Sequence, residues 1–194
     1  MKLRRIISTI IITGILLIAF CSCNSSGNEK SSSATEPTVK IEGLECDVFS
    51  ISSENLKDGV WDTCISNTKN GSNQSPQLSW EPVEDAKYYS VYMVDTSAGN
   101  WIHWKSEYLE ETSLKLGWAS STKYKGPCPP SGTHSYEIFI FALKEKPSAK
   151  LNIFLNARCA TFFKQVIALD LLEDGSKGNV IAFGHIKGTY TYGD

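Results

Sequence analysis

The chain has 194 residues, with 19 Lys and Arg against 21 Asp and Glu, which gives a formal net charge of −2 at neutral pH. This balance lacks the basic excess with which proteins bind nucleic acid or anionic lipid over their general surface. From Lys40 to Asp194 there are about 155 residues, enough for one domain with its own hydrophobic core, and no internal repeat is visible.

The chain begins with the pattern of an export signal. A basic start, residues 1–5, precedes an apolar stretch over residues 6–20. That stretch is too short and too often interrupted by polar residues for a membrane span. We interpret residues 1–22 as a lipoprotein signal peptide, because Ser22-Cys23 resembles a bacterial lipobox, with Cys21 as the other candidate for lipidation. The alternative is an ordinary secretory signal.

The next segment predicts a tether. Residues 23–40 are mostly Ser, Asn, Gly, Glu, Lys and Thr and offer no apolar face to bury. Cleavage after residue 22 would remove three basic residues and leave 16 against 21 acidic ones, a net charge of about −5. We therefore expect a domain over residues 41–194, anchored through Cys23 on the outer side of a bacterial cytoplasmic membrane, with secretion as the alternative.

The first half of the domain favours strands. Residues 45–51 predict a strand, residues 56–77 a loop rich in Asn, Gly, Ser and Asp, and residues 78–80 a short strand. Residues 88–95 are apolar on both alternations, which is typical of a central strand covered on both faces. Another strand is expected to begin at Trp101.

A proline-rich loop is the most distinctive segment. Residues 126–132 contain three prolines, which fix φ and remove amide donors, so this segment is neither helix nor inner strand. An apolar strand is predicted over residues 136–143. The stiff loop should therefore deliver His134 and Tyr136 to one end of a sheet, where small ligands are often bound.

The end of the chain predicts one helix and one strand. Residues 157–172 show a helical period, residues 173–179 a turn, and residues 180–192 a terminal strand. The apolar stripe of the helix is formed by Cys159, Phe162, Phe163, Val166 and Ile167. Because strands dominate and the helix comes late, we expect a β-rich α+β fold.

The domain has four cysteines, at positions 46, 64, 128 and 159. Outside the cytoplasm they can form disulfides, and four cysteines allow three complete pairings among which the sequence does not choose. A zinc site is not favoured, because no Cys-x-x-Cys or Cys-x-x-His spacing occurs.

Four polar residues are expected near strand ends: Asp95, His103, His134 and Tyr136. Imidazole and phenol donors can hold a phosphate or carboxylate oxygen, and a carboxylate can orient an imidazole ring. The sequence thus predicts a small cup for an anion. Two alternatives remain open, namely hydrogen-bonded structural residues and a metal site made of two histidines and a carboxylate.

Catalytic interpretations find less support. The chain has neither a Gly-x-Ser-x-Gly nor a His-Glu-x-x-His motif. Ser131 lies three residues before His134, and Cys128 lies between prolines, so both are candidate nucleophiles by type alone. A disulfide or an unreactive thiol is the simpler interpretation of Cys128.

Four short motifs follow one another along the chain. They are residues 75–80 (SPQLSW), Val94-Asp95, His103-Trp104 and residues 126–136 (GPCPPSGTHSY). In this order they resemble the motifs of the phosphatidylethanolamine-binding proteins, and most closely those of the bacterial branch that is similar to the Raf kinase inhibitor. The resemblance extends over residues 44–194.

The resemblance implies a large antiparallel sheet, a smaller sheet and a few peripheral helices. It also implies a shallow pocket for phosphate-bearing head groups and a non-enzymatic binding protein without a cofactor. The partner would be a small anion or a phospholipid head group, and not nucleic acid. The pocket residues that carry over are Asp95, His103, Pro129, Pro130, His134 and Tyr136.

The chain departs from the family pattern in two places. The family's aspartate strand often continues as Asp-Pro-Asp, whereas here Asp95 is followed by Thr96 and Ser97, so one acidic rim residue is missing. After His103-Trp104 comes Lys105, where many relatives stay apolar. Lys105 is expected either to bring a positive charge near the pocket or to face water.

A second function is an alternative. The domain would inhibit an extracellular peptidase or another enzyme by direct contact, with three tryptophans, Trp61, Trp101 and Trp118, as exposed anchors. Inhibition of the Raf kinase itself is not expected, because an exported bacterial lipoprotein would not meet that kinase.

Overall fold

The computed structural model describes residues 39–193. The predicted signal peptide and nearly all of the predicted tether lie outside the described residues. Strands dominate the described part of the chain, as the sequence predicts. No helix within residues 39–193 combines the length and apolarity that crossing a bilayer requires.

A seven-stranded sheet forms the centre of the domain. The main path runs in the order β2 (Leu56–Lys57), β3 (Val60–Trp61), β9 (Val180–Thr191), β8 (Thr133–Leu143), β5 (Tyr88–Asp95) and β6 (Trp101–Leu109). The four long strands β9, β8, β5 and β6 pair with one another in antiparallel fashion, whereas β3 and the additional strand β1 (Asp47–Phe49) pair with β9 in parallel. Two further strands, β4 (Leu78–Ser79) and β7 (Ser113–Leu114), form a separate small sheet.

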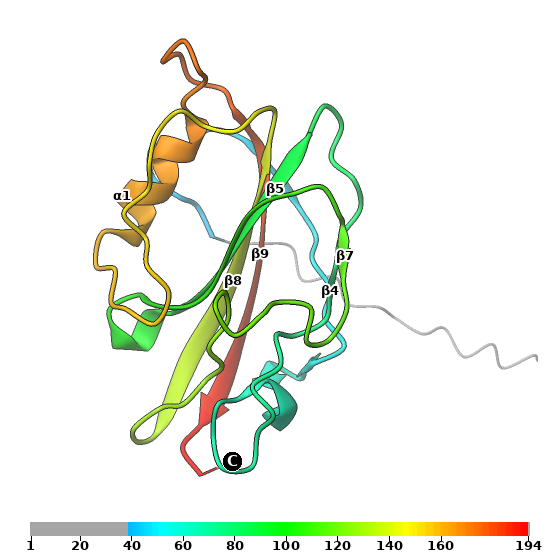
Figure 1. Ribbon diagram of the computed structural model, residues 1–194, viewed down its shortest axis with the longest axis vertical. Helices are drawn as coiled ribbons and strands as arrows, with labels where there is room; N and C mark the ends of the chain where they lie inside the picture. Colours follow the sequence, from blue (N-terminus) through cyan, green and yellow to red (C-terminus); the bar gives the residue numbers. More distant parts are fainter. Residues whose placement is uncertain (1–38, 194) are drawn as a thin grey trace, which may run out of the picture. The chain divides into compact units, whose positions relative to one another are not determined.

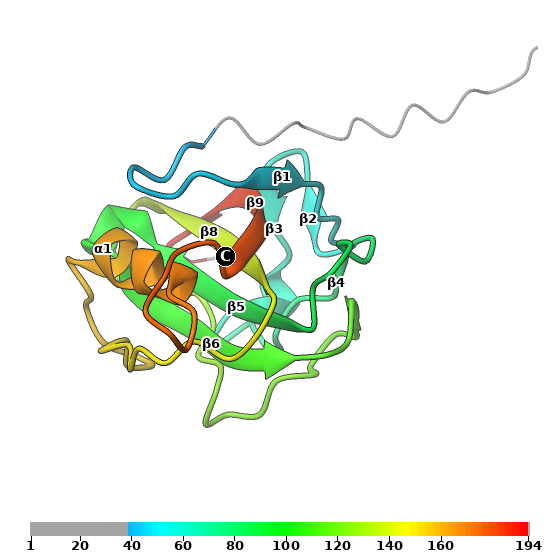
Figure 2. The same ribbon diagram turned by 90° about the horizontal axis from the view of Figure 1, so that it is seen from above.

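Both faces of the large sheet are covered. Figure 1 shows helix α1 (Phe162–Val166) on one side of the sheet and strands β4 and β7 on the other, and Figure 2 shows the same arrangement from above. Two clusters of buried hydrophobic side chains form the core. Strand β5 contributes to both, because Val91 and Met93 belong to one cluster and Tyr92 and Val94 to the other. The prediction of a central strand over residues 88–95 is confirmed.

The predicted helix over residues 157–172 is too long. Only α1 is α-helical, and it continues as the 3-10 helix η3 (Ile167–Asp170). Residues 156–159 instead pair by backbone hydrogen bonds with residues 100–102, at the start of β6. The apolar stripe is nevertheless buried where expected, since Phe162 packs on Tyr92 and Phe139 with ring centroids 5.7 Å apart in each case.

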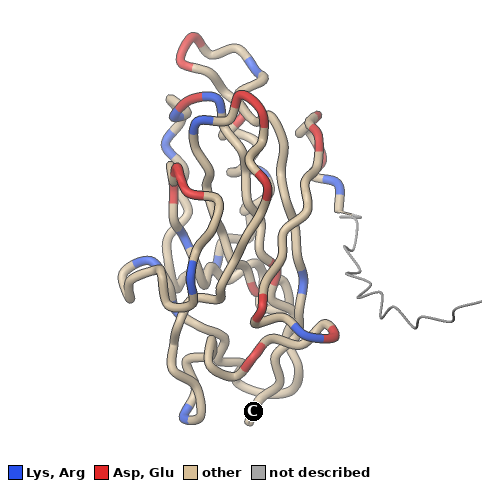
Figure 3. Tube along the Cα trace, turned by 90° about the vertical axis from the view of Figure 1, so that its right-hand side faces the viewer, with Lys and Arg blue, Asp and Glu red and all other residues tan. Residues whose placement is uncertain are grey.

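Other boundaries shift by a few residues. The first strand is shorter than residues 45–51, β8 begins already at Thr133, and residues 56–77 contain β2, β3 and the 3-10 helix η1 (Thr63–Ile65). Charged residues of both signs are interspersed along the described chain (Figure 3). Within residues 39–193 the four cysteines are separate thiols, and Cys128 is exposed.

Candidate ligand-binding site

Three strand ends converge because of the sheet register. Asp95, the last residue of β5, pairs with Tyr136 of β8 on one side and with Trp101 of β6 on the other. His134 and His103 lie two residues from Tyr136 and Trp101, and side chains two residues apart along a strand share a face. The register therefore brings the predicted polar residues to one end of the sheet.

A cavity of about 570 Å³ opens at this end. Five of the six predicted pocket residues line it: Asp95, His103, Pro130, His134 and Tyr136. Pro129 does not belong to its lining, because this residue turns inward and is buried while Pro130 is exposed. The prediction that Pro129 contributes a pocket surface is thus corrected to a supporting place beneath the loop.

Asp95 fixes the ring of His134. Its Oδ2 lies 2.7 Å from His134 Nδ1, and its Oδ1 accepts a hydrogen bond of 3.0 Å from the amide of Ala98, which caps the 3-10 helix η2 (Thr96–Ala98). The Asp95 side chain is 4% exposed. A carboxylate accepts, so Nδ1 of His134 carries a proton and Nε2 remains as the ring's other polar atom.

His103 is held in a similar way by a backbone carbonyl. Its Nδ1 donates to the oxygen of Lys125 over 2.6 Å. Burial lowers the pKa of His103, and the Lys125 carbonyl opposes that effect only in part. The ring is therefore neutral near pH 7, with its proton on Nδ1, and its edge packs against Tyr136 with centroids 5.1 Å apart.

The Tyr136 hydroxyl is buried beside the Asp95 carboxylate and the backbone of Cys128, and within residues 39–193 it makes no hydrogen bond of standard geometry. Burial raises the pKa of this phenol, and the negative charge of Asp95 raises it further. The hydroxyl thus stays protonated and is a donor. An unsatisfied buried polar group costs about 1–3 kcal/mol, so a ligand oxygen that accepted from it would recover stability.

The proline loop is braced from below by residues 65–73. Gly126 donates its amide proton to Asn73 Oδ1 over 2.8 Å, and Pro127 accepts from the amide of Asn67 over 2.8 Å. A Cβ on Gly126 would overlap the carbonyl oxygen of Ile65, so only glycine fits here. This packing fixes the Lys125 carbonyl and, through it, the ring of His103.

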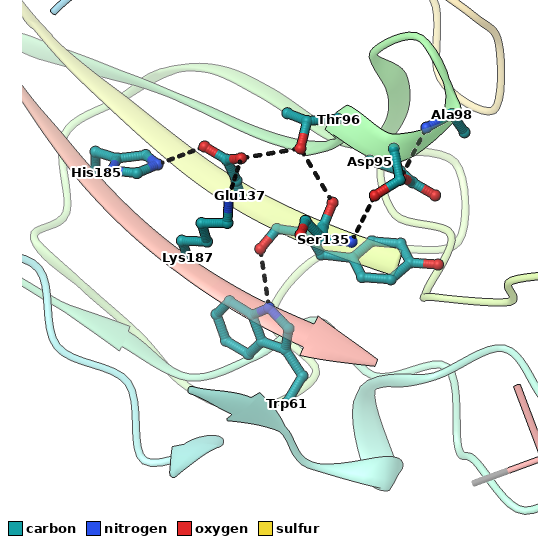
Figure 4. Close-up of polar contacts among 10 residues, drawn as sticks. Trp61, Asp95, Thr96, Ala98, Ser135, Glu137, His185 and Lys187 are labelled. Carbon is teal, nitrogen blue, oxygen red and sulfur yellow. Dashed lines mark hydrogen bonds and ion pairs between the residues drawn. The ribbon is translucent and has the colours of Figure 1, made fainter. Parts of the chain in front are cut away.

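On the opposite face of β8, Glu137 anchors the same strand ends (Figure 4). Its carboxylate accepts from His185 Nε2 over 2.8 Å and from Thr96 Oγ1 over 2.9 Å, and Lys187 Nζ lies 3.3 Å away. Burial alone would raise the pKa of Glu137, but these hydrogen bonds and the neighbouring positive charges lower it to about 2. Because Thr96 follows Asp95 directly, Glu137 secures the turn that carries the pocket carboxylate.

Two residues with predicted roles, Lys105 and Trp61, have other environments than the sequence suggests. Lys105 neither lines the cavity nor extends freely into water, because its Nζ donates to the Ile153 carbonyl and pairs with Glu107 at 3.3 Å. Trp61 is 2% exposed and donates its Nε1 proton to the Tyr136 carbonyl, so it is no surface anchor. No cluster of three or more metal-ligating side chains occurs in the described chain.

Sequence reasoning missed part of the cavity wall. Lys125, Asn156 and Arg158 line the cavity together with Trp101. The predicted helix had placed Arg158 in its first turn, away from the site. One signal was available, since Arg158 is the only arginine after residue 5.

Comparisons with known proteins agree with this fold. Residues 52–191 match the sequence model of the phosphatidylethanolamine-binding protein family, and the chain belongs to that family. A UPF0098 protein from Methanothermobacter thermautotrophicus is 34% identical over 97 residues, an alignment that covers 39% of this chain and 64% of the relative. The chain thus matches a little under two thirds of that relative's length.

Two solved structures share the fold. A phosphatidylethanolamine-binding protein homologue from Chlamydia trachomatis has a TM-score of 0.56 and 22% identity, covering 74% of this chain and 97% of its own. YbcL of Escherichia coli, described as a new member of the mammalian family, has a TM-score of 0.55 and 23% identity, covering 74% and 98%. The predicted family and the predicted fold are confirmed.

Proposed function

We propose that this protein is a non-enzymatic, exported binding protein whose cavity holds a small anionic group such as a phosphate or a phospholipid head group. The observation that carries the proposal is the convergence of the buried Tyr136 hydroxyl with His103 and His134 in one cavity. Both histidines use Nδ1 for protein contacts, and a protonated ring carries a second N–H, on Nε2, that can donate to an anion.

The charge of the cavity supports the same ligand class. Its lining contains one carboxylate, Asp95, and two cationic side chains, Lys125 and Arg158. Asp95 is already engaged by His134 and by the Ala98 amide. The net charge of the lining is therefore positive, and protonation of either histidine would make the electrostatic potential in the cavity more positive.

Binding is favoured over catalysis by the arrangement of the candidate nucleophiles. Cys128 lines the cavity, but within the described residues its thiol has no hydrogen bond to His103 or His134. A cysteine nucleophile needs a base that shares its proton. We therefore assign the His134–Asp95 pair to ligand orientation.

Sulfate binding should strengthen as the pH falls. Sulfate keeps both its charges between pH 8 and pH 5.5, so a change in affinity reports on the protein. Histidine ordinarily titrates near pH ~6.5, and its protonated ring offers an Nε2 donor and a positive charge. Because burial lowers the pKa of His103, part of the gain should come below that value. Titration calorimetry should show about tenfold tighter binding at the lower pH.

A flat affinity over this range, or no saturable binding at any pH, would contradict the proposal. The variant His134→Gln provides the matched comparison, because it keeps a polar side chain that does not titrate. It should show a smaller pH dependence than the wild-type protein.

The membrane tether is proposed from the N-terminal sequence and is tested separately. If Cys23 is the lipidated residue, Cys23→Ala should release the protein from the membrane fraction and abolish incorporation of labelled fatty acid. Cys21→Ala, which removes the neighbouring thiol, should leave both unchanged. Labelling that persists in Cys23→Ala and disappears in Cys21→Ala would move the anchor, and labelling of neither form would leave a secreted protein.

A further inference from the structure

The cavity continues beyond the histidines to residues 156–158. Residues 156–159 are fixed against the start of β6, where Asn156 and Ala157 exchange hydrogen bonds of 2.8 and 3.0 Å with Ile102. Asn156 and Arg158 are two residues apart, and both line the cavity. The side chain of Asn156 is tied to this wall by the indole Nε1 of Trp101, which donates to its Oδ1 over 3.4 Å.

Arg158 is placed by a close approach to Gly99. Gly99 ends η2 with φ of 68°, and a Cβ built on it would come within 2.7 Å of Nη2 and 2.8 Å of Cζ of Arg158. The guanidinium therefore lies close against the turn that Asp95 caps. A side chain at position 99 would have to displace it.

The guanidinium has no acidic partner in the described chain. The ion pairs among residues 39–193 join Lys105 to Glu107, His134 to Asp95, and both His185 and Lys187 to Glu137. The single carboxylate of the cavity is Asp95, which His134 and Ala98 occupy. A planar group with paired donors thus borders the cavity without forming an ion pair within residues 39–193.

The choice of arginine also suggests a carboxylate ligand. After residue 5 every basic residue except Arg158 is lysine. Lysine offers a point charge, whereas the guanidinium fork matches the two oxygens of a carboxylate or phosphate in a bidentate fashion. A cavity of about 570 Å³ lies within the range of small-molecule sites and exceeds what a lone phosphate fills.

Building on the proposed function, we propose that the cavity selects phosphate esters that carry a second anionic group. The phosphate lies at Tyr136 and the two histidines, and a carboxylate of the same molecule pairs with Arg158. Such chemistry occurs in small phosphorylated carboxylic acids and in the serine head group of phospholipids. Trp101 and Asn156 form the wall between the two ends.

The test compares two matched ligand pairs on the full-length protein by titration calorimetry. Glycerol 3-phosphate and 3-phosphoglycerate differ by one carboxylate in a monoester. Glycerophosphoethanolamine and glycerophosphoserine differ by one carboxylate in a diester. A preference within the monoester pair would indicate a soluble phosphorylated acid as the ligand, and a preference within the diester pair a lipid head group. We expect the carboxylate form of at least one pair to bind about tenfold to 100-fold more tightly.

Variants separate Arg158 from general charge. Arg158→Gln should abolish the preference and leave the carboxylate-free ligand within about twofold, and Arg158→Lys should keep only part of it. Gly99→Ala retains the charge but displaces the guanidinium, so it should also reduce the preference. Lys144→Gln removes one exposed positive charge just beyond the far end of β8 and should change nothing.

The outcomes distinguish this inference from the proposed function. Equal affinities within both pairs, or an equal loss for both members of a pair in Arg158→Gln, would overturn the role of Arg158 while sulfate binding remained. Failure of sulfate and of all four esters to bind would overturn the anion site itself.

Discussion

Replacing His134 by alanine is expected to weaken sulfate binding at pH 5.5 by at least about tenfold while the protein still folds and unfolds cooperatively. In its protonated form, which pH 5.5 favours, the imidazole donates from Nε2 a charge-assisted hydrogen bond, worth about 1.5–3 kcal/mol, to a bound anion. The fold should survive the substitution, because Asp95 keeps its hydrogen bond to the Ala98 amide when the contact with His134 is lost. Calorimetry and a thermal melt on the same sample measure both quantities.

The variant Asp95→Ala tests whether Asp95 acts on the bound anion through its charge or by orienting His134. Removing a negative charge from the cavity would strengthen anion binding if only the local field mattered. If Asp95 orients His134 and caps η2, as the distances of 2.7 and 3.0 Å indicate, binding should weaken instead. The double variant with His134→Ala should bind no more weakly than His134→Ala alone, because the two residues act as one unit. Tighter binding in Asp95→Ala would contradict the orienting role.

Glu137→Gln is expected to reduce the free energy of unfolding at pH 7 by about 3 kcal/mol, which is the largest effect on stability that we predict. The variant removes the charge on which His185 and Lys187 converge and leaves a buried imidazole without its carboxylate. The Glu137 side chain is only 10% exposed, so solvent screens this network weakly. Urea unfolding at pH 7 measures the loss, and Glu84→Gln, at an exposed position, is the matched control.

The same carboxyl predicts an acid-sensitive fold. The pKa of Glu137 falls from an ordinary value of 4.5 to about 2 in the folded protein, so its stabilisation is complete above pH 4.5 and is lost as the pH falls towards 2. The wild-type protein should lose up to about 3 kcal/mol across this window through this group. Glu137→Gln should lack that part of the acid dependence. Parallel acid profiles for the two proteins would contradict the assignment.

The sequence was sufficient for the centre of the site. Residues 88–95 are apolar on both alternations, which is possible only for a strand covered on both faces, and the structure places Asp95 at the end of that strand. The prolines of residues 126–132 enforce a loop before β8, so His134 and Tyr136 reach the same end of the sheet. These features depend on local rules, which a single sequence reveals.

The rest of the site depends on contacts between distant segments. The period of residues 157–172 is helical, but backbone pairing with the start of β6 holds residues 156–159 in place and brings Arg158 into the cavity. Nothing in the local pattern signals that pairing. Likewise, Glu137 and His185 look like ordinary polar residues in apolar strands until the β8–β9 register brings them within 2.8 Å. Tertiary contacts decide both cases.

The three histidines of the chain provide the most direct test of the proposed site, because two line the cavity and the third, His185, binds Glu137 on the other face of the sheet. Imidazole nitrogen resonances should be followed by NMR while sulfate is added at constant ionic strength. We predict saturable shifts for His103 and His134 and none for His185. Equal shifts of all three, or no saturable shift of the two cavity histidines, would contradict an anion site at this end of the sheet.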